Sequence, residues 1–168
     1  MNNTVEMNET LIRKMLAYYS GDPARIQHYT KVYSYASMIG PAEHLSDELQ
    51  HILETAAILH DIGIKIAEEK YHCSTGSLQE KEGPAAARQM LTECGTYSDA
   101  VIDRVCYLIG HHHTYSNIVG LDYQILVEAD FLVNLYEDHA DKQAIQTAID
   151  RIFITKSGTE MAHVMFNV

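Results

Sequence analysis

The chain has 168 residues, of which 46% are hydrophobic, and it carries a formal net charge of −11. This composition is sufficient for a hydrophobic core and argues against global disorder. The acidic balance argues against binding to nucleic-acid backbones or anionic membranes, because both require a basic surface.

The sequence features that relate to location point to the cytoplasm. No apolar run approaches the roughly 18 residues of a membrane span, and no apolar segment follows a basic N-terminal stretch. The cysteines, Cys73, Cys94 and Cys106, are odd in number and have no CxxC spacing, which argues against a disulfide framework or a cysteine zinc site. We therefore expect a cytoplasmic protein that binds neither membranes nor nucleic acid.

Apolar residues recur with helical spacing along most of the chain, and strand-like alternation is scarce. Capping residues such as Asp22 and Ser46 mark helix starts, and glycines mark several ends. These signals predict helices over about residues 8–19, 22–40, 46–60, 83–95, 98–112, 120–134 and 142–154, with a short helix after residue 157. We expect an all-α, single-domain bundle of about six to seven helices over residues 1–168. Its core would cover about residues 22–140, with the N-terminal helix 8–19 and the C-terminal helices 142–167 packed against it.

One stretch departs from the helical pattern. Residues 68–81 include the segment Tyr-His-Cys-Ser-Thr-Gly-Ser, which is rich in turn-forming residues. A loop of this length in a helical protein is commonly functional. We expect a loop over residues 68–81, followed by a helix that begins at Gly83-Pro84.

His60 and Asp61 stand next to each other inside the apolar run Ala-Ala-Ile-Leu-His-Asp-Ile-Gly of residues 56–63. A buried, ionised carboxylate is costly unless it is paired or bound to a metal. The sequence therefore predicts partners for this pair elsewhere in the chain.

Asp130 presents the same problem in another helix. It follows Leu126 and Val127 by four and three residues, which places it on the buried stripe of the most apolar helix. Glu128 lies off this stripe, and we expect it to face solvent. Asp130 is thus a second carboxylate that requires a buried partner.

Inward-facing polar groups occur on four predicted helices. Imidazoles and carboxylates that project from facing helices are typical ligands of a divalent metal in a helical bundle. The mixture of histidine and aspartate without cysteine favours manganese, iron, cobalt, nickel or zinc in a catalytic site over a structural zinc site. Histidines that serve only for packing are the alternative. The candidate residues are His28, the His60-Asp61 pair, His112 with its neighbours, and Asp130.

The order of these residues resembles the signature of the HD-domain metal-dependent phosphohydrolase superfamily. The matching segments are residues 25–32 around the first histidine, residues 59–63 around the His-Asp pair and residues 128–132 around the final aspartate, within a resemblance that covers about residues 26–136. The resemblance implies an HD-domain fold. It also implies that one metal ion is bound by His28, His60, Asp61 and Asp130.

Family members with two metal ions add histidines from the intervening helices, and Asp61 would then bridge the ions. The segment Ile-Gly-His-His-His of residues 109–113 resembles the double-histidine segment of those members. We expect His111 and His112 to be the ligands and His113 to be a bystander. The resemblance thus implies one or two divalent ions.

Two positions depart from the family pattern. Glu82 stands where binuclear members have a histidine before a small residue and a helix, so it is either a carboxylate ligand or a solvated acid at a helix start. Many relatives have a lysine three residues after the aspartate, but Ile64 occupies that position here and Lys65 follows it. We expect Lys65 to contact substrate phosphate; the alternative is a solvated cation at a helix end.

The resemblance implies a metal-dependent phosphohydrolase that uses metal-activated water to cleave a phosphomonoester or phosphoanhydride. The expected substrate is a small phosphorylated compound, a nucleotide. Asp61 and Lys65 are the expected catalytic residues, and the loop of residues 68–81 would cover the site. The alternative is a non-catalytic regulatory domain that binds metal or nucleotide.

Overall fold

The structure, a computed structural model, describes residues 3–168, and within this range the chain forms nine helices and no strand. The predicted all-α class is confirmed. The helices are α1 (Asn3–Tyr18), α2 (Pro23–Ala42), α3 (Asp47–Leu59), α4 (Gly63–Tyr71), α5 (Gly76–Cys94), α6 (Asp99–Ile109), α7 (Leu121–Glu137), α8 (Lys142–Ile152) and α9 (Lys156–Phe166). None of the helices in this range combines the length and apolar composition that a membrane crossing requires.

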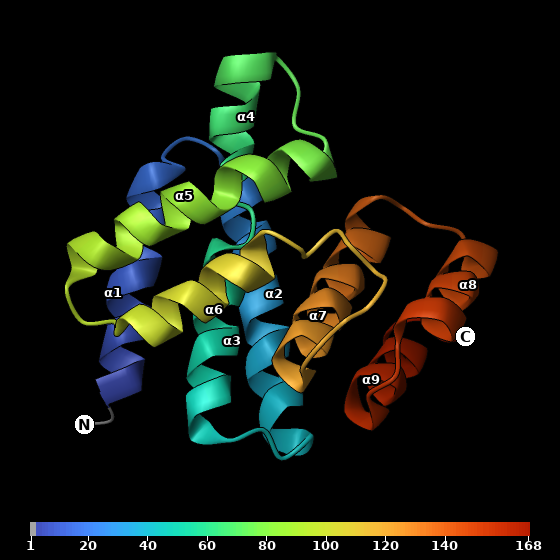
Figure 1. Cartoon of the computed structure of the whole chain (residues 1–168). Coiled ribbons are helices and arrows are strands. Elements are labelled where there is room, and N and C mark those ends of the chain that lie inside the picture. Colours follow the sequence, from blue (N-terminus) through green and yellow to red (C-terminus); the bar gives the residue numbers. More distant parts are fainter. Residues whose placement is uncertain (1–2) are drawn as a thin grey trace.

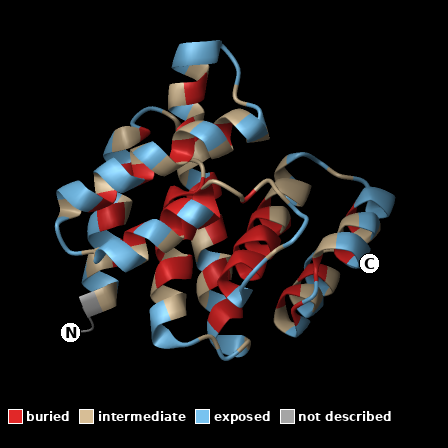
Figure 2. Ribbon diagram, viewed as in Figure 1, coloured by how far each residue is buried: buried red, intermediate tan, exposed pale blue. Residues whose placement is uncertain are grey.

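The helices α2, α3, α6 and α7 form the centre of the bundle (Figure 1). α5 packs on α6, and α4 stands at one end of the molecule on α5. α1 packs on α3, whereas α8 and α9 pack against each other and against α7. Burial is concentrated on the inward faces of α3, α6 and α7 (Figure 2). This arrangement brings α2, α3 and α7 together, and these helices carry the polar groups that the sequence singles out.

Helix starts follow the local signals closely. The Asp22 side chain accepts a hydrogen bond from the backbone N–H of Arg25 at 3.1 Å, and Ser46 accepts one from Leu49 at 3.3 Å. Each bond satisfies an amide that lacks a partner in the first turn of a helix. The predicted caps are therefore confirmed.

The expected loop over residues 68–81 is wrong. α4 continues to Tyr71 and α5 begins at Gly76, so the connection is limited to residues 72–75. Pro84 lies inside α5 instead of starting it, and its carbonyl accepts a hydrogen bond from Cys106 Sγ at 3.3 Å. Packing of α5 on α6 thus keeps the segment helical although proline removes a backbone donor.

α4 and α5 approach each other closely at Gly63. A Cβ atom at this position would lie 2.7 Å from both the carbonyl oxygen of Gln79 and the backbone nitrogen of Gly83. The contacts are with backbone, which cannot move aside as a side chain could. A glycine is therefore required directly after the His60-Asp61 turn.

Glu128 is fully buried, which contradicts the expectation that it faces solvent. Its carboxylate accepts hydrogen bonds from the backbone N–H groups of Ile154 and Thr155 at 2.8 and 3.0 Å and from Gln124 Nε2 at 2.8 Å. The connection between α8 and α9 folds back over this face of α7. The spacing of apolar residues within a helix cannot predict such a contact between segments that are distant in the sequence.

Candidate metal centre

His28 reaches the site from α2, and its ring is anchored by α7. The side chain is 10% exposed, and its Nδ1–H donates a hydrogen bond to Glu137 Oε2 at 2.8 Å. A carboxylate can only accept this bond, so Nδ1 carries the proton in the neutral ring. The other nitrogen, Nε2, points toward His60 and Asp130.

His60 and Asp61 lie in the turn that joins α3 to α4. The fully buried His60 donates its Nδ1–H to the carbonyl oxygen of Ala57 at 2.8 Å, which again leaves Nε2 as the free nitrogen. Tyr18, the last residue of α1, and Tyr19, which follows it, hold the turn: the Tyr19 hydroxyl donates to the Asp61 carbonyl oxygen at 2.7 Å, and the Tyr18 hydroxyl donates to the Ile62 carbonyl oxygen at 3.1 Å. The backbone under the His-Asp pair is therefore fixed from outside α3 and α4.

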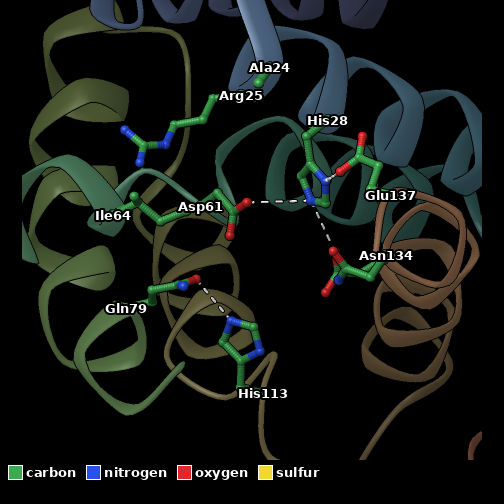
Figure 3. Close-up of a pocket in the computed structure, with 10 residues that line it drawn as sticks. Ala24, Arg25, His28, Asp61, Ile64, Gln79, His113, Asn134 and Glu137 are labelled. Carbon is green, nitrogen blue, oxygen red and sulfur yellow. Dashed lines mark hydrogen bonds and ion pairs between the residues drawn. The ribbon is translucent and has the colours of Figure 1, made fainter. Parts of the chain in front are cut away.

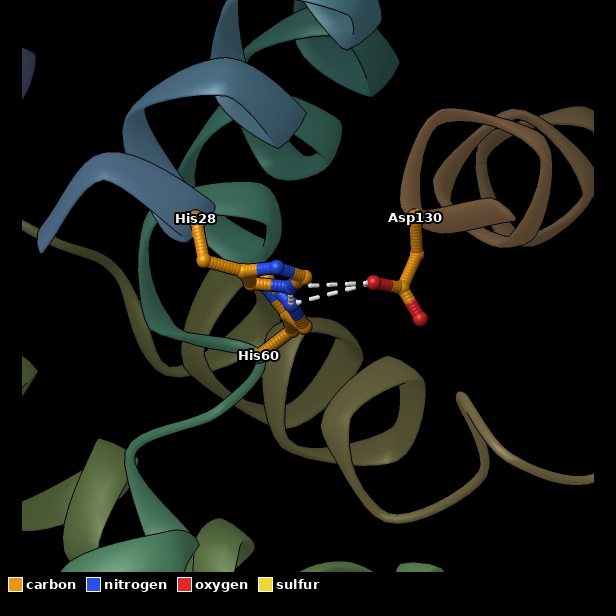
Figure 4. A group of neighbouring side chains, drawn as sticks. All are labelled: His28, His60 and Asp130. Carbon is orange, nitrogen blue, oxygen red and sulfur yellow. Dashed lines mark hydrogen bonds and ion pairs between the residues drawn. The ribbon is translucent and has the colours of Figure 1, made fainter. Parts of the chain in front are cut away.

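Four of the predicted residues converge on one point. His28 Nε2 lies 3.1 Å from His60 Nε2, 3.1 Å from Asp130 Oδ1 and 3.4 Å from Asp61 Oδ2. Figure 4 shows that His28 from α2, His60 from the turn after α3 and Asp130 from α7 project toward one another. The expected burial of Asp130 is observed, at 2% exposure.

The donor set of this cluster fits a divalent cation. Because the Nδ1 atoms of His28 and His60 donate to Glu137 and Ala57, both Nε2 lone pairs face the same small space. Two lone pairs 3.1 Å apart repel each other unless a proton or a cation lies between them. Histidines oriented by a carboxylate and by a backbone carbonyl are typical of metal ligands.

A second group lies beside the first one. The fully buried His112 donates Nδ1–H to the carbonyl oxygen of Ile109 at 2.7 Å, and its Nε2 has no hydrogen-bond partner within residues 3–168. That nitrogen lies 3.6 Å from Asp61 Oδ1. Asp61, His112 and His113 offer ligand atoms within 4.8 Å of one another. An orphaned buried nitrogen aimed at a carboxylate fits a second cation, with Asp61 between the two groups.

The charges of the cluster depend on one another. Burial opposes charge on Asp61, but His60, His112 and His28 outweigh this effect and lower the pKa of Asp61 to about 2. Burial likewise opposes charge on His28, but the hydrogen bond to Asp130 and the nearby carboxylates raise its pKa to about 9. Without a cation, a proton on His28 therefore compensates part of the negative charge.

Two predicted ligands lie outside the cluster. His111 donates Nδ1–H to the Tyr107 carbonyl oxygen at 2.7 Å and stacks on the Tyr107 ring. Glu82 accepts hydrogen bonds from Lys70 Nζ at 2.6 Å and from the Tyr71 hydroxyl at 2.8 Å. The unbroken helix α5 turns Glu82 toward α4, whereas Gln79, one turn earlier, reaches the site. The structure therefore does not bring His111 or Glu82 together with the other candidate metal ligands.

His113, the expected bystander, is at the site. Its Nε2–H donates to Gln79 Oε1 at 2.9 Å, and Gln79 Nε2 donates to the carbonyl oxygen of Ser74 at 2.9 Å. Burial and the neighbouring His112 lower the pKa of His113 to about 4, so its ring is neutral. The structure therefore pairs His113, and not His111, with His112.

Lys65 also lies away from the cluster. Its ammonium group donates to the Tyr18 carbonyl oxygen at 3.3 Å and lies over the Tyr18 ring. Because α4 is helical from Gly63 onward, Ile64 faces the site and Lys65 faces a separate cavity between α1, α4 and α5. The expected phosphate contact by Lys65 has no support in this geometry.

A pocket of about 260 Å³ opens over the cluster (Figure 3). Arg25 lines this pocket although it is not among the residues predicted from the sequence, and it forms ion pairs with Glu68 at 2.6 Å and Asp22 at 3.1 Å. The sequence contains a signal that places Arg25 at the site, because Arg25 precedes His28 by three residues and lies on the same helix face. The lining residues are Ala24, Arg25, His28, Asp61, Ile64, Gln79, His113, Asp130, Asn134 and Glu137.

Comparison with known proteins identifies one family. A family model described as HD domain matches residues 25–150, which include every residue of both groups. Neither the curated proteins nor the solved structures give a significant match to the chain.

Proposed function

The chain belongs to the HD domain family, and from this membership we propose that it is a metal-dependent phosphohydrolase. The observation that carries the proposal is the convergence of His28, His60 and Asp130, whose free nitrogens and carboxylate oxygen lie within 4.8 Å of one another. Their orientation by hydrogen bonds to Glu137 and Ala57 supports a site built to hold a cation.

His28, His60, Asp61 and Asp130 would hold one divalent ion, and Asp61, His112 and His113 would form a second position. Iron, manganese, cobalt, nickel and zinc all suit this mixture of imidazole and carboxylate. When bound, such an ion polarises a phosphoryl oxygen and lowers the pKa of water toward neutrality. Glu82 and His111 are not part of this proposal.

Arg25, and not Lys65, would contact the substrate phosphate. Its guanidinium lines the same pocket as Asp61 and Asp130, and it can present two parallel N–H groups to a phosphoryl group. Asp61, whose pKa is about 2, remains ionised and can accept a hydrogen bond from the attacking water. Together these two residues would orient the water and the phosphorus atom for in-line attack.

The substrate of this proposal is a phosphomonoester or a phosphoanhydride, of which a nucleotide is the expected example. Support for this class comes from the family and from the combination of a guanidinium and a cation-binding cluster in one pocket. A regulatory domain that binds but does not hydrolyse its ligand is the competing proposal.

The test is hydrolysis by purified protein loaded separately with manganese, cobalt, nickel, iron or zinc. A panel of nucleotides and simple phosphate esters is assayed for released phosphate. Asp61→Asn should lower turnover about 100-fold or more, whereas Asp150→Asn on the exposed face of α8 should not change it. Metal binding without hydrolysis of any compound would favour the regulatory domain.

A further inference from the structure

The pocket over the cluster is small for a whole nucleotide. Its volume is about 260 Å³, below the roughly 300–1,000 Å³ typical of pockets that enclose a drug-sized ligand. Asp61 and Asp130 are among its most buried lining residues, with side chains 15% and 2% exposed. The reacting group of the substrate must therefore enter the pocket first. Only this group is enclosed by the pocket, and the rest of the substrate stays outside.

The charge of the lining limits how many phosphate groups it can accept. Within residues 3–168, Arg25 is the only lysine or arginine that lines the pocket, whereas Asp61, Asp130 and Glu137 contribute carboxylates. An ion at the first position would balance Asp61 and Asp130, and Lys31 pairs with Glu137, which leaves Arg25 and an ion at the second position for phosphate. The surroundings add no positive field, because the whole chain carries a formal net charge of −11.

The other cations near the pocket are already engaged. Lys31 Nζ lies 2.5 Å from Glu137 Oε1. Arg25 itself shares its guanidinium between Glu68 and Asp22, at 2.6 and 3.1 Å. One phosphoryl group can be bound by the remaining N–H donors of Arg25 and by an ion at the second position, but the further phosphates of a di- or triphosphate would meet no other lysine or arginine among the lining residues.

We propose that the substrate is a phosphomonoester, whose single phosphoryl group fills the pocket while the alcohol part stays outside. This inference rests on the proposed function and narrows its substrate class. The water oxygen bonds to phosphorus, and the bond from phosphorus to the alcohol oxygen breaks. The bonding electron pair stays on the alcohol oxygen, which takes up a proton that the water gives up. The products are an alcohol and inorganic phosphate.

The experiment compares the mono-, di- and triphosphate of one nucleoside, together with a small aryl monophosphate, on the metal-loaded protein. We expect kcat/KM to be at least about 10-fold higher for the nucleoside monophosphate than for the di- and triphosphate. The aryl monophosphate should lie within about 10-fold of the nucleoside monophosphate, because the pocket does not enclose the leaving group. A preference for the triphosphate would overturn the inference while leaving the proposed hydrolase intact.

If no compound is hydrolysed, the result counts against the proposed function. The inference about the substrate class can still be tested by measuring nucleotide binding. The dissociation constants of the nucleoside mono- and triphosphate are then compared by calorimetry on the metal-loaded protein. Tighter binding of the monophosphate supports the size and charge argument. Tighter binding of the triphosphate overturns it.

A charge variant tests the cause of the preference. Asn134 lines the pocket one turn after Asp130, so Asn134→Lys adds a second cation and Asn134→Met is the neutral control of similar length. The lysine variant should raise kcat/KM for the triphosphate relative to the monophosphate about 5-fold or more over the methionine variant. Equal selectivity in the two variants would contradict the charge argument.

Discussion

The nitrogens that the proposed metal centre would use are oriented by hydrogen bonds made on the far side of each ring. His28 donates to Glu137, His60 to Ala57 and His112 to Ile109, so all three Nε2 atoms face the carboxylates of the cluster. Two of these acceptors are backbone carbonyls that a side-chain change cannot remove. Glu137 is the acceptor that a substitution can alter.

Glu137→Gln should weaken divalent-metal binding about 10- to 100-fold, because a neutral amide holds the His28 ring less firmly and donates less electron density to it. The metal dissociation constant, measured by competition with a chelator, checks this expectation. Glu160→Gln is the matched control, since Glu160 lies exposed on α9. Equal affinities for both variants would exclude an orienting role for Glu137.

Arg25→Ala should lower kcat/KM for a phosphate ester about 100-fold, because the guanidinium is the cation that faces the phosphoryl group. The metal content should stay the same, since Arg25 contacts Asp22, Glu68 and the Tyr19 ring but no proposed ligand. Arg13→Ala removes an exposed arginine of α1 and serves as the control. Full activity in Arg25→Ala would remove this residue from the proposed site.

Residue spacing could predict which side chains are buried only where the helix itself was predicted correctly. His28, His60 and Asp130 lie on helices or caps whose phase follows from the apolar pattern, and the structure brings them together. The register of the triple histidine could not be predicted in this way. α6 ends at Ile109, so His111 and His113 lie in a turn where helical spacing no longer applies.

At the level of helices, the two misplaced residues share one cause. The family pattern selects Glu82 and Lys65, and the turn-forming residues predict a loop over residues 68–81 between them. α4 and α5 are continuous helices instead, and the close contact of α4 with α5 at Gly63 fixes their phase. Turn-forming residues in the sequence could not reveal that packing on α6 keeps Pro84 inside a helix.

α1 and Tyr19, which directly follows it, precede the segment matched by the family model, yet they support the site. Tyr19→Phe removes the hydroxyl that donates to the Asp61 carbonyl oxygen at 2.7 Å. We expect a loss of about 1 kcal/mol in the free energy of unfolding and weaker metal binding, because the turn that carries Asp61 loses an anchor. Thermal unfolding and metal titration measure the two effects.

Tyr29→Phe is the control for this prediction. Tyr29 is 1% exposed, and its hydroxyl has no hydrogen-bond partner among the described residues. Removing it should leave metal binding unchanged. If Tyr29→Phe and Tyr19→Phe bind metal equally well, the Tyr19 hydroxyl has no part in positioning Asp61.

For the whole molecule, protons and metal ions should compete for the same nitrogens. In the cation-free protein the pKa of His28 is about 9, because the hydrogen bond to Asp130 and the surrounding carboxylates outweigh the effect of burial. A raised pKa means that protonation stabilises the fold. This contribution is fully present below the ordinary value of about 6.5 and is lost as the pH rises through about 9.

We therefore expect the free energy of unfolding of chelator-treated protein to fall between about pH 6.5 and pH 9. Metal affinity should rise over the same interval, since the ligand form of histidine is neutral. Denaturant titrations at several pH values, with and without metal, measure both trends. Stability that is constant or rises with pH in the chelator-treated protein would contradict this charge arrangement.

The metal content of the purified protein tests the central claim most directly. Wild-type protein, loaded with manganese or cobalt and then dialysed, should retain at least one divalent ion per chain by elemental mass spectrometry. His60→Ala and Asp130→Ala should lose it while keeping the helical circular dichroism spectrum, and Asp150→Ala on the surface of α8 should not. If both site variants retained as much metal as the wild type, the proposed metal centre would be wrong.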